Sequence, residues 1–194
     1  ILQASLYKEV QKLFSEKNCL VFPNRADEFF VVSNGLELDD HIQIQKALEK
    51  LFDIRLTISI GYGESPFEAN LKAHEGKKNE TILNKEHNIF GFVNGKLDSK
   101  VSIMHLDVDD LTSKGETNSP YEISSIIFSL YSKMSKFFLQ KDSLTFFMGG
   151  DNFMVIASED AKKSVQNFID IIKSDDKISL NCGIGNGFTA REAV

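Results

Sequence analysis

The sequence contains no tryptophan, only two cysteines and three prolines, and 12 glycines among its 194 residues. So little glycine and proline excludes collagen-like and low-complexity chains, and a hydrophobic content of 42% excludes a disordered one. No apolar stretch approaches the roughly 20 residues that a membrane-spanning helix needs. Acidic residues outnumber basic ones, and the net charge of −6 disfavours broad binding to nucleic acid. The composition predicts one ordinary globular domain or two small ones.

The few cysteines and histidines lack the spacing of a metal site. Cys19 and Cys182 lie too far apart in sequence for a CxxC pair, and the four histidines show no HExxH pattern. A structural zinc site is therefore not expected. Two unpaired, reduced thiols are typical of a cytoplasmic protein.

The most informative feature is an internal repeat at an offset of 124 residues. Residues 20–34 fall on residues 144–158 with five of 15 positions identical, including Asp27 on Asp151. At the same offset, residues 54–69 fall on residues 178–193 with seven of 16 identical. Two unrelated α/β segments can share the same hydrophobic periodicity. Shared periodicity does not explain identical Asp and Gly residues at one constant offset. The sequence therefore predicts a duplicated domain.

The second copy predicts the element order βαββαβ. Its apolar and amphipathic segments are a strand at 101–108, a helix at 120–140, a hairpin at 144–157, a helix at 161–174 and a strand at 177–184. This order is typical of the ferredoxin-like plan, an α+β fold with helices on one face of an antiparallel sheet.

We accordingly expect two tandem ferredoxin-like palm domains. The first repeat covers residues 1–78, a linker with a short hairpin covers 79–100, and the second repeat covers 101–194. The first-copy counterpart of Asp107 falls at position −17 (107 minus 124), before the first printed residue, so we expect the first repeat to lack its N-terminal strand here. The helix that begins near Thr189 is expected to be truncated.

Two aspartates are the candidate catalytic residues. Asp107 lies near the end of the first strand of the second copy, and Asp151 lies in the following hairpin turn. The first and third strands of a βαββαβ sheet are neighbours, so the two carboxylates are expected to converge. Mg²⁺ prefers oxygen ligands, often one or two carboxylates together with substrate phosphates. Gly149 and Gly150 carry no side chain, which allows a phosphate or ribose to approach the backbone.

These motifs resemble those of the GTP cyclohydrolase III family, a mainly archaeal family of tandem palm domains related to GGDEF and nucleotidyl cyclase palms. The resemblance spans nearly the whole chain and is carried by five segments: Gly61–Ala69, His105–Asp109, Ser119–Glu122, Phe147–Met154 and Gly183–Gly187. The Gly-Gly-Asp hairpin alone also occurs in diguanylate cyclases and palm polymerases, whereas its combination with tandem copies is much more specific.

The resemblance implies an activity and a set of site residues. The activity is hydrolysis of GTP with opening of the guanine imidazole ring at C8 and removal of the terminal phosphates. Two Mg²⁺ ions and a monovalent cation such as K⁺ are implied as cofactors, in a cytoplasmic homo-oligomer, dimer or tetramer, that binds no membrane. Asp107 and Asp151 are implied as catalytic residues. The implied metal ligands are Asp107, Val108, Asp109 and Asp151, and the implied substrate-binding residues are Gly149, Gly150, Asn152, Tyr121 and Glu122.

Some of these assignments have alternatives. Tyr121 and Glu122 begin a helix, where backbone N–H groups favour anions, but a helix start with an acidic first turn explains them equally well. At the level of function, a palm-type nucleotidyl cyclase or polymerase, or a non-catalytic nucleotide-binding module, stands beside the ring-opening hydrolase. The identity of the product would separate these classes.

Overall fold

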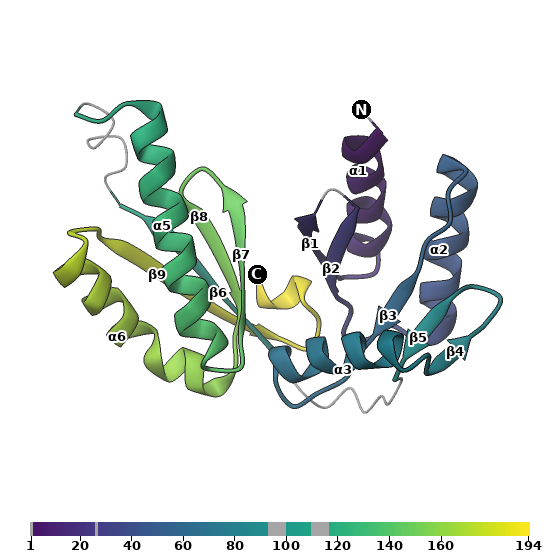
Figure 1. Ribbon diagram of the computed structural model, residues 1–194. Helices are drawn as coiled ribbons and strands as arrows, with labels where there is room; N and C mark the ends of the chain where they lie inside the picture. The colour runs from purple at the N-terminus through teal and green to yellow at the C-terminus, as the bar shows by residue number, and fades with distance from the viewer. Residues whose placement is uncertain (1, 26, 93–99, 110–116) are drawn as a thin grey trace. The chain divides into compact units, whose positions relative to one another are not determined.

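The computed structural model describes residues 2–25, 27–92, 100–109 and 117–194. By their internal contacts these residues form two compact units (Figure 1). Unit 1 comprises residues 1–64, 68–101 and 186–194, and unit 2 comprises residues 65–67 and 102–185. The boundaries differ from those of the sequence repeats, because a short piece of each repeat groups with the opposite unit.

Unit 2 has the predicted ferredoxin-like arrangement. Its elements are β6 (Val101–Val108), α5 (Pro120–Leu139), β7 (Leu144–Gly149), β8 (Asn152–Ile156), α6 (Glu159–Asp175) and β9 (Leu180–Gly187). The strands form one sheet in the order β7-β8-β6-β9, with β8 antiparallel to both β7 and β6. This is the order in which the first and third strands of a βαββαβ unit are neighbours. The prediction of an α+β, ferredoxin-like fold is confirmed.

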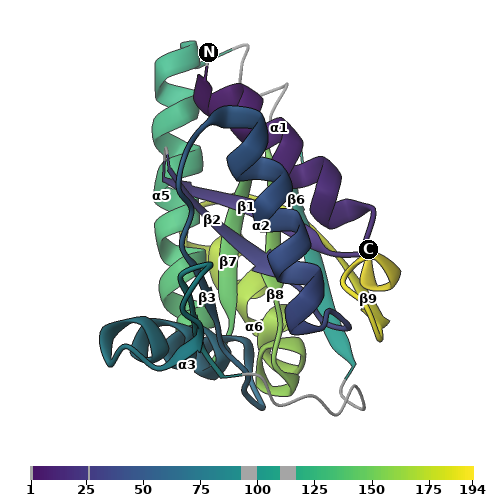
Figure 2. The same ribbon diagram turned by 90° about the vertical axis from the view of Figure 1, so that its right-hand side faces the viewer.

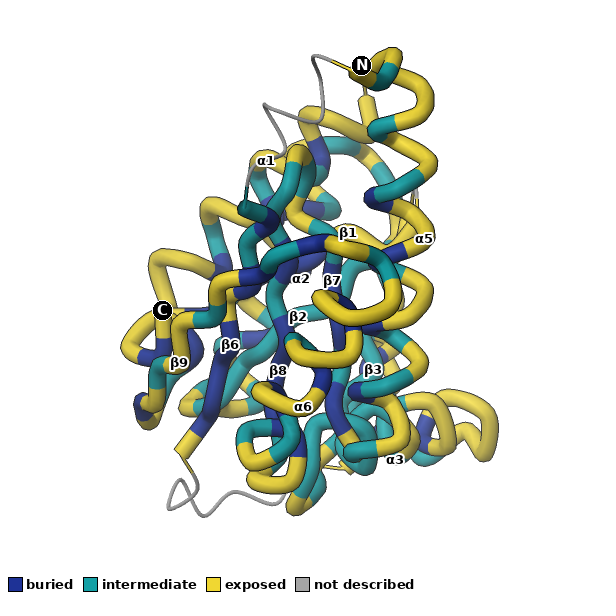
Figure 3. The backbone as a smooth tube through the Cα atoms, turned by 90° about the vertical axis from the view of Figure 1, so that its left-hand side faces the viewer, coloured by how far each residue is buried: buried dark blue, intermediate teal, exposed yellow. Residues whose placement is uncertain are grey.

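One hydrophobic core joins both helices to one face of this sheet. Alternate residues of β6 and β8 enter it, because successive side chains of a strand point to opposite faces. Figure 3 shows the central strands of the sheet as largely buried. The fully buried members of this core are Met104, Leu106, Met134, Phe138, Phe153, Val155, Ala161 and Ile172.

Unit 1 contains two separate small sheets. Its elements are α1 (Leu2–Ser15), β1 (Leu20–Arg25), β2 (Glu28–Val32), α2 (Leu38–Phe52), β3 (Ile58–Ile60), α3 (Pro66–Lys78), β4 (Ile82–Asn84), β5 (Ile89–Gly91) and a 3₁₀ turn, η1 (Arg191–Ala193). The first turn of α3 groups with unit 2. Helices α1 and α2 pack together over the β1–β2 hairpin (Figure 2), and β5 lies between β3 and β4 in the second sheet.

The β4–β5 hairpin occupies the segment that the sequence assigns to a linker. Ile89 in β5 is completely buried, and the Gln45 side-chain amide donates to the Leu56 and His87 carbonyls at 2.8 and 2.5 Å. These contacts anchor the hairpin to α2. The structure thus has a hairpin at residues 82–91 that the sequence did not predict. The hairpin predicted within residues 89–95 stays a prediction, because residues 93–95 lie outside the described part of the chain.

The two repeats adopt the same local conformations at the 124-residue offset. The strands β1 and β2 coincide with β7 and β8 residue for residue. Asn18 and its counterpart Asp142 both have a left-handed backbone, with φ of 60° and 52°. Tyr7 stacks on Phe29 with ring centroids 5.7 Å apart, as Tyr131 stacks on Phe153 at 6.1 Å. The structure therefore supports the internal duplication.

A glycine in each repeat has the same packing role. A Cβ atom on Gly63 would lie 2.6 Å from the Ala69 nitrogen, and one on Gly187 would lie 2.8 Å from the Ala193 nitrogen. These close approaches explain why Gly63 and Gly187 match in the two repeats. The glycines allow the strand end to pack against the turn that follows it.

The two repeats differ in the strand that joins their hairpin to the last strand of the sheet. In unit 2, β6 lies between β8 and β9 and joins them in one sheet. Among the described residues of the first repeat no strand corresponds to β6, and β1–β2 and β3 belong to separate sheets. In the described part of the chain, Asp107 thus lies on a strand that has no second copy.

Candidate active site

Asp107 lies at the end of β6, on the sheet face opposite to the helices. Its neighbours Leu106 and Val108 are 0% and 3% exposed and belong to the hydrophobic core beneath α5 and α6. The alternation of a strand therefore turns Asp107 to the other face. There the residue is half-buried, and its side chain remains accessible.

The β7–β8 hairpin brings Asp151 to the same place. Asp107 is paired with Asn152 in the antiparallel register of β6 and β8. The Val108 amide donates to the Asp151 carbonyl at 3.3 Å, and the Asn152 side-chain amide donates to Asp151 Oδ1 at 2.7 Å. The structure thus brings the backbones of Asp107, Val108, Asp151 and Asn152 together at one end of the sheet, and convergence of the two carboxylates on one ligand stays a prediction.

The glycines of the turn are required by backbone conformation. Gly149 and Gly150 have backbone φ angles of +99° and +64°, in the region that residues other than glycine rarely adopt. A Cβ atom on either would meet nothing within 4 Å. The space beside this turn is therefore open. A ligand of the two aspartates can approach the backbone here.

The donor set at this end of the sheet fits Mg²⁺. Among the described residues there is no cluster of three or more His, Cys, Asp or Glu that could enclose a metal ion. Mg²⁺ does not need such a cluster, because it commonly binds one or two carboxylates and completes its octahedral shell with water and substrate phosphates. Two neighbouring carboxylates also repel one another, and a divalent ion relieves that repulsion. Asp107 and Asp151 provide two carboxylates as ligands, and a divalent ion would relieve the repulsion between them.

Asp109, the further predicted metal ligand, contacts the neighbouring strand. Its backbone amide donates to the Ser179 carbonyl at 2.9 Å, and its carboxylate accepts a hydrogen bond from the Asn181 side chain at 2.5 Å. Sequence reasoning missed Asn181. The adjacency of the first and last strands in a βαββαβ sheet is the signal that could have found it. Asp110, which follows, lies outside the described residues.

The start of α5 has a capping function. Ser119 and Glu122 form a reciprocal capping box, in which the Ser119 amide donates to the Glu122 carboxylate at 2.7 Å. These hydrogen bonds lower the pKa of Glu122 below its usual value. Tyr121 is 84% exposed. The helix-start explanation of Glu122 is thus realised, and binding of substrate by Tyr121 and Glu122 stays a prediction.

Topology places all of these groups at one end of the sheet. The chain leaves the C-terminal end of β6 toward the start of α5, and the hairpin turn at Gly149–Asp151 faces that same end because β8 is antiparallel to β6. The fold and the site together define an α+β palm-type protein, with one aspartate at the end of a central strand of a ferredoxin-like sheet and another in the adjacent hairpin turn.

The chain belongs to the GTP cyclohydrolase III family. The family model described as GTP cyclohydrolase III matches residues 1–194. A relative named GTP cyclohydrolase III from Methanothermobacter thermautotrophicus is 30% identical over 202 residues, which cover 100% of this chain and 79% of the relative. One of the same name from Methanocaldococcus jannaschii is 28% identical and covers 99% of this chain and 73% of the relative.

Solved structures with some similarity include GGDEF domains. A microbial GGDEF domain described with bis-(3′,5′)-cyclic di-GMP has a TM-score of 0.42 and 18% identity, over 48% of this chain and 65% of that one. The GGDEF domain of DgcB from Caulobacter crescentus, in complex with c-di-GMP, has a TM-score of 0.40 and 12% identity, over 72% of this chain and 83% of that one.

Proposed function

We propose that this protein hydrolyses GTP, opens the imidazole ring of guanine at C8 and removes the terminal phosphates. The product is 2-amino-5-formylamino-6-(5-phosphoribosylamino)pyrimidin-4(3H)-one. One water adds at C8 and its oxygen stays in the formyl group, while further waters cleave the phosphoanhydride bonds and release inorganic phosphate. The observation that carries this proposal is the pairing of Asp107 with the Asp151 turn in a chain of the GTP cyclohydrolase III family.

The residues at the end of β6 have defined roles in this proposal. Asp107, Asp151 and the Val108 carbonyl hold Mg²⁺, with Asp109 as a further candidate ligand. Bound Mg²⁺ neutralises the triphosphate and lowers the pKa of water. Asn152 orients Asp151 through the hydrogen bond to Oδ1. The open turn at Gly149 and Gly150 admits the phosphates.

Substrate contacts from α5 complete the proposed site. Tyr121 presents an exposed ring beside the first turn of the helix, and Glu122 fixes that turn through the capping box. A monovalent cation such as K⁺ is proposed as a second cofactor on the strength of the family resemblance.

The proposed cellular context follows from the substrate and the thiols. Both cysteines are free thiols, and among the described residues no helix is long and apolar enough to span a membrane. We propose a cytoplasmic homo-oligomer, dimer or tetramer. Light scattering of the purified protein would give its mass in solution, and a monomer at micromolar concentration would contradict the oligomer.

The proposal is tested by turnover of the full chain with GTP, Mg²⁺ and K⁺, following phosphate release and absorbance. Asp107→Asn and Asp151→Asn keep the side-chain shape and remove the charge. We expect each to reduce turnover by at least about 100-fold, the order of loss seen when one electrostatic contact to a transition state is removed. Asp175→Asn is the matched control, because Asp175 is exposed at the end of α6. Equal activity of all variants would contradict the assigned site.

A further inference from the structure

Unit 2 exposes an uncharged, partly apolar surface along one side of α5 and the adjoining strand β7. The two elements pack against each other and lie side by side in Figure 1. Phe128 and Leu139 of α5 are 59% and 43% exposed, and Met148 of β7 is 38% exposed. We call this surface the α5–β7 flank. Its members are Ser124, Phe128, Ser132, Ser135, Leu139 and Met148.

The spacing of the α5 members places them on one side of the helix. They recur every three or four positions, which is the spacing of neighbours on a helix surface. The ring of Phe128 meets that of Phe147 in β7 edge to face, with centroids 6.0 Å apart. No member of the flank is charged, whereas 26% of all residues in the chain are. An exposed surface of this composition is typical of an interaction site.

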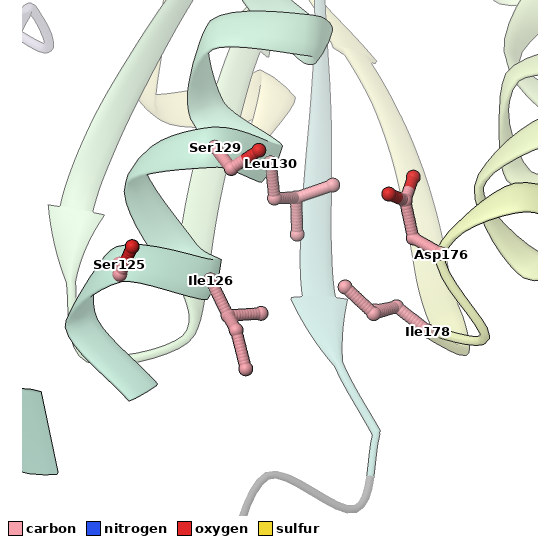
Figure 4. Close-up of a pocket in the computed structure, with 6 residues that line it drawn as sticks. All are labelled: Ser125, Ile126, Ser129, Leu130, Asp176 and Ile178. Atoms are coloured by element: carbon pink, nitrogen blue, oxygen red, sulfur yellow. The ribbon is translucent and has the colours of Figure 1, made fainter. Parts of the chain in front are cut away.

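The other side of α5 faces residues of its own unit. Figure 4 shows Ile126 and Leu130 of α5 on one wall of a cavity of about 220 Å³, and Ile178 on the other. Lys133, on the same side of the helix, forms an ion pair with Asp176, and its Nζ lies 2.5 and 2.7 Å from the two carboxylate oxygens. This side of α5 therefore serves the packing of unit 2 and carries charge, in contrast to the flank.

The first repeat provides an internal comparison, because its α1 and β1 match α5 and β7 at the 124-residue offset. The two helices end at matching residues, Ser15 and Leu139, and the two strands have the same bounds. Four flank positions differ in chemistry. The counterparts are Ala4 for Phe128, Lys8 for Ser132, Ser15 for Leu139 and Asn24 for Met148. The matching surface of the first repeat is therefore polar and charged, so the apolar flank is specific to the second repeat.

The strand within the flank is an edge strand. In the described residues the sheet runs β7-β8-β6-β9, so β7 is its last strand on this side. Edge strands are often protected from pairing with another chain by proline or by charged residues. The matching strand of the first repeat contains Pro23 and Arg25. In β7 these positions are Phe147 and Gly149, so this protection is lost.

We propose that the α5–β7 flank binds the same flank of a second copy of this chain around a two-fold axis. Such an axis brings β7 antiparallel to β7 of the second copy, so the surface is complementary to itself. Two copies with a net charge of −6 repel one another, and an uncharged surface is where they approach at least cost. A partner of opposite charge would find no charged group on the flank to pair with.

The size of the flank suits a stable dimer. Helix α5 has 20 residues and is about 30 Å long. The helix layer and the sheet layer together are about 20 Å thick, so the flank covers about 600 Å² in each copy. Two copies would bury about 1,200 Å², the lower end of the range for specific, stable interfaces. The inference rests on the proposed homo-oligomer and names its interface, and it does not depend on the proposed reaction.

The test compares Phe128→Glu with Ala4→Glu, the same change at the matching exposed position of the first repeat. Sedimentation of the full chain over a range of concentrations gives the Kd of self-association, with folding checked by circular dichroism. We expect Phe128→Glu to raise this Kd at least about 100-fold, because the two-fold axis brings like charges together in a dry contact. Ala4→Glu should keep the wild-type Kd. Equal Kd values for wild type and folded Phe128→Glu would overturn the inference.

Cross-linking tests the same contact without a new charge. Ser132 lies near the middle of α5, so a two-fold axis through the flank places the two Ser132 positions near one another. With a short bismaleimide, Ser132→Cys should form a covalent dimer, whereas Lys8→Cys at the matching position should not. The wild type gives the background from its own thiols, Cys19 and Cys182. Equal yields from the two variants would contradict the interface.

Neither measurement uses turnover, so failure of this inference is distinguishable from failure of the proposed reaction. A wild type that stays monomeric at micromolar concentration would overturn both the homo-oligomer and its interface. An oligomer that survives Phe128→Glu unchanged would overturn the interface and leave the homo-oligomer intact. The product formed from GTP bears on the proposed reaction alone.

Discussion

Replacing Asp107 by Asn should stabilise the metal-free protein while it removes the response to Mg²⁺. Asp107 pairs with Asn152, and Asp151 is the next residue along the hairpin. Side chains at neighbouring positions of adjacent strands lie about 5–8 Å apart, and we take about 6–8 Å as the order of magnitude of the separation of the two carboxylates. Two charges at that distance repel by about 0.5–0.7 kcal/mol in bulk water and by about four times as much at an effective dielectric constant of 20. Because this end of the sheet is half-exposed, we expect a gain near the lower value.

With Mg²⁺ added, the wild type should be more stable than Asp107→Asn. A ligand at ten times its Kd stabilises the folded state by about 1.4 kcal/mol, which raises the Tm of a chain of this size by about 3–6 °C. The wild type should show this increase, and Asp107→Asn should show little of it. Thermal unfolding with EDTA and with Mg²⁺ measures both effects, and Asp175→Asn serves as control. An equal Mg²⁺ response in wild type and Asp107→Asn would refute a metal site at this position.

Three further predictions concern packing in the two repeats. Phe153→Ala should lower the free energy of unfolding by about 3–5 kcal/mol, because Phe153 is fully buried. Phe29→Ala should lower it less, because Phe29, its counterpart in the first repeat, is half-buried. Urea titration measures both losses. Gly187→Ala should destabilise more than Gly150→Ala in the same assay, since only at Gly187 would the added Cβ meet backbone atoms. Burial raises the pKa of the Cys19 thiol from 9.0 to about 12. Because the thiol ionises first in the unfolded chain, the free energy of unfolding should fall progressively between those two pH values. A free energy of unfolding that does not change in this pH range would contradict the prediction.

The sequence predicts unit 2 well because strong periodicity and local signals agree there. The strand at 101–108 is found with the predicted bounds, and the Gly-Gly-Asp turn lies where its positive φ angles require glycine. The neighbourhood of Asp107 and Asp151 follows from strand order alone, since a βαββαβ sheet places its first and third strands together. These features need no knowledge of side-chain packing.

Other features depend on contacts between distant segments. The β4 and β5 strands have three residues each, too short for a periodic signal. The lysine-, glutamate- and asparagine-rich sequence of residues 73–87, which contains β4, is typical of a linker. The contact of Asp109 with Asn181 joins residues 72 apart, and that of Lys133 with Asp176 joins residues 43 apart. Neither pair has a spacing that would identify it, so both contacts emerge only from the structure.

The most direct test of the central claim is the mass spectrum of the product formed from GTP in ¹⁸O-labelled water. The account predicts a ring-opened formylamino-pyrimidine ribosyl monophosphate that carries ¹⁸O in its formyl group, because the water that attacks C8 leaves its oxygen there. The product should be absent with Asp107→Asn and present with Asp175→Asn. A cyclic or oligomeric guanylate, or a guanosine phosphate with its imidazole ring intact, would contradict the account.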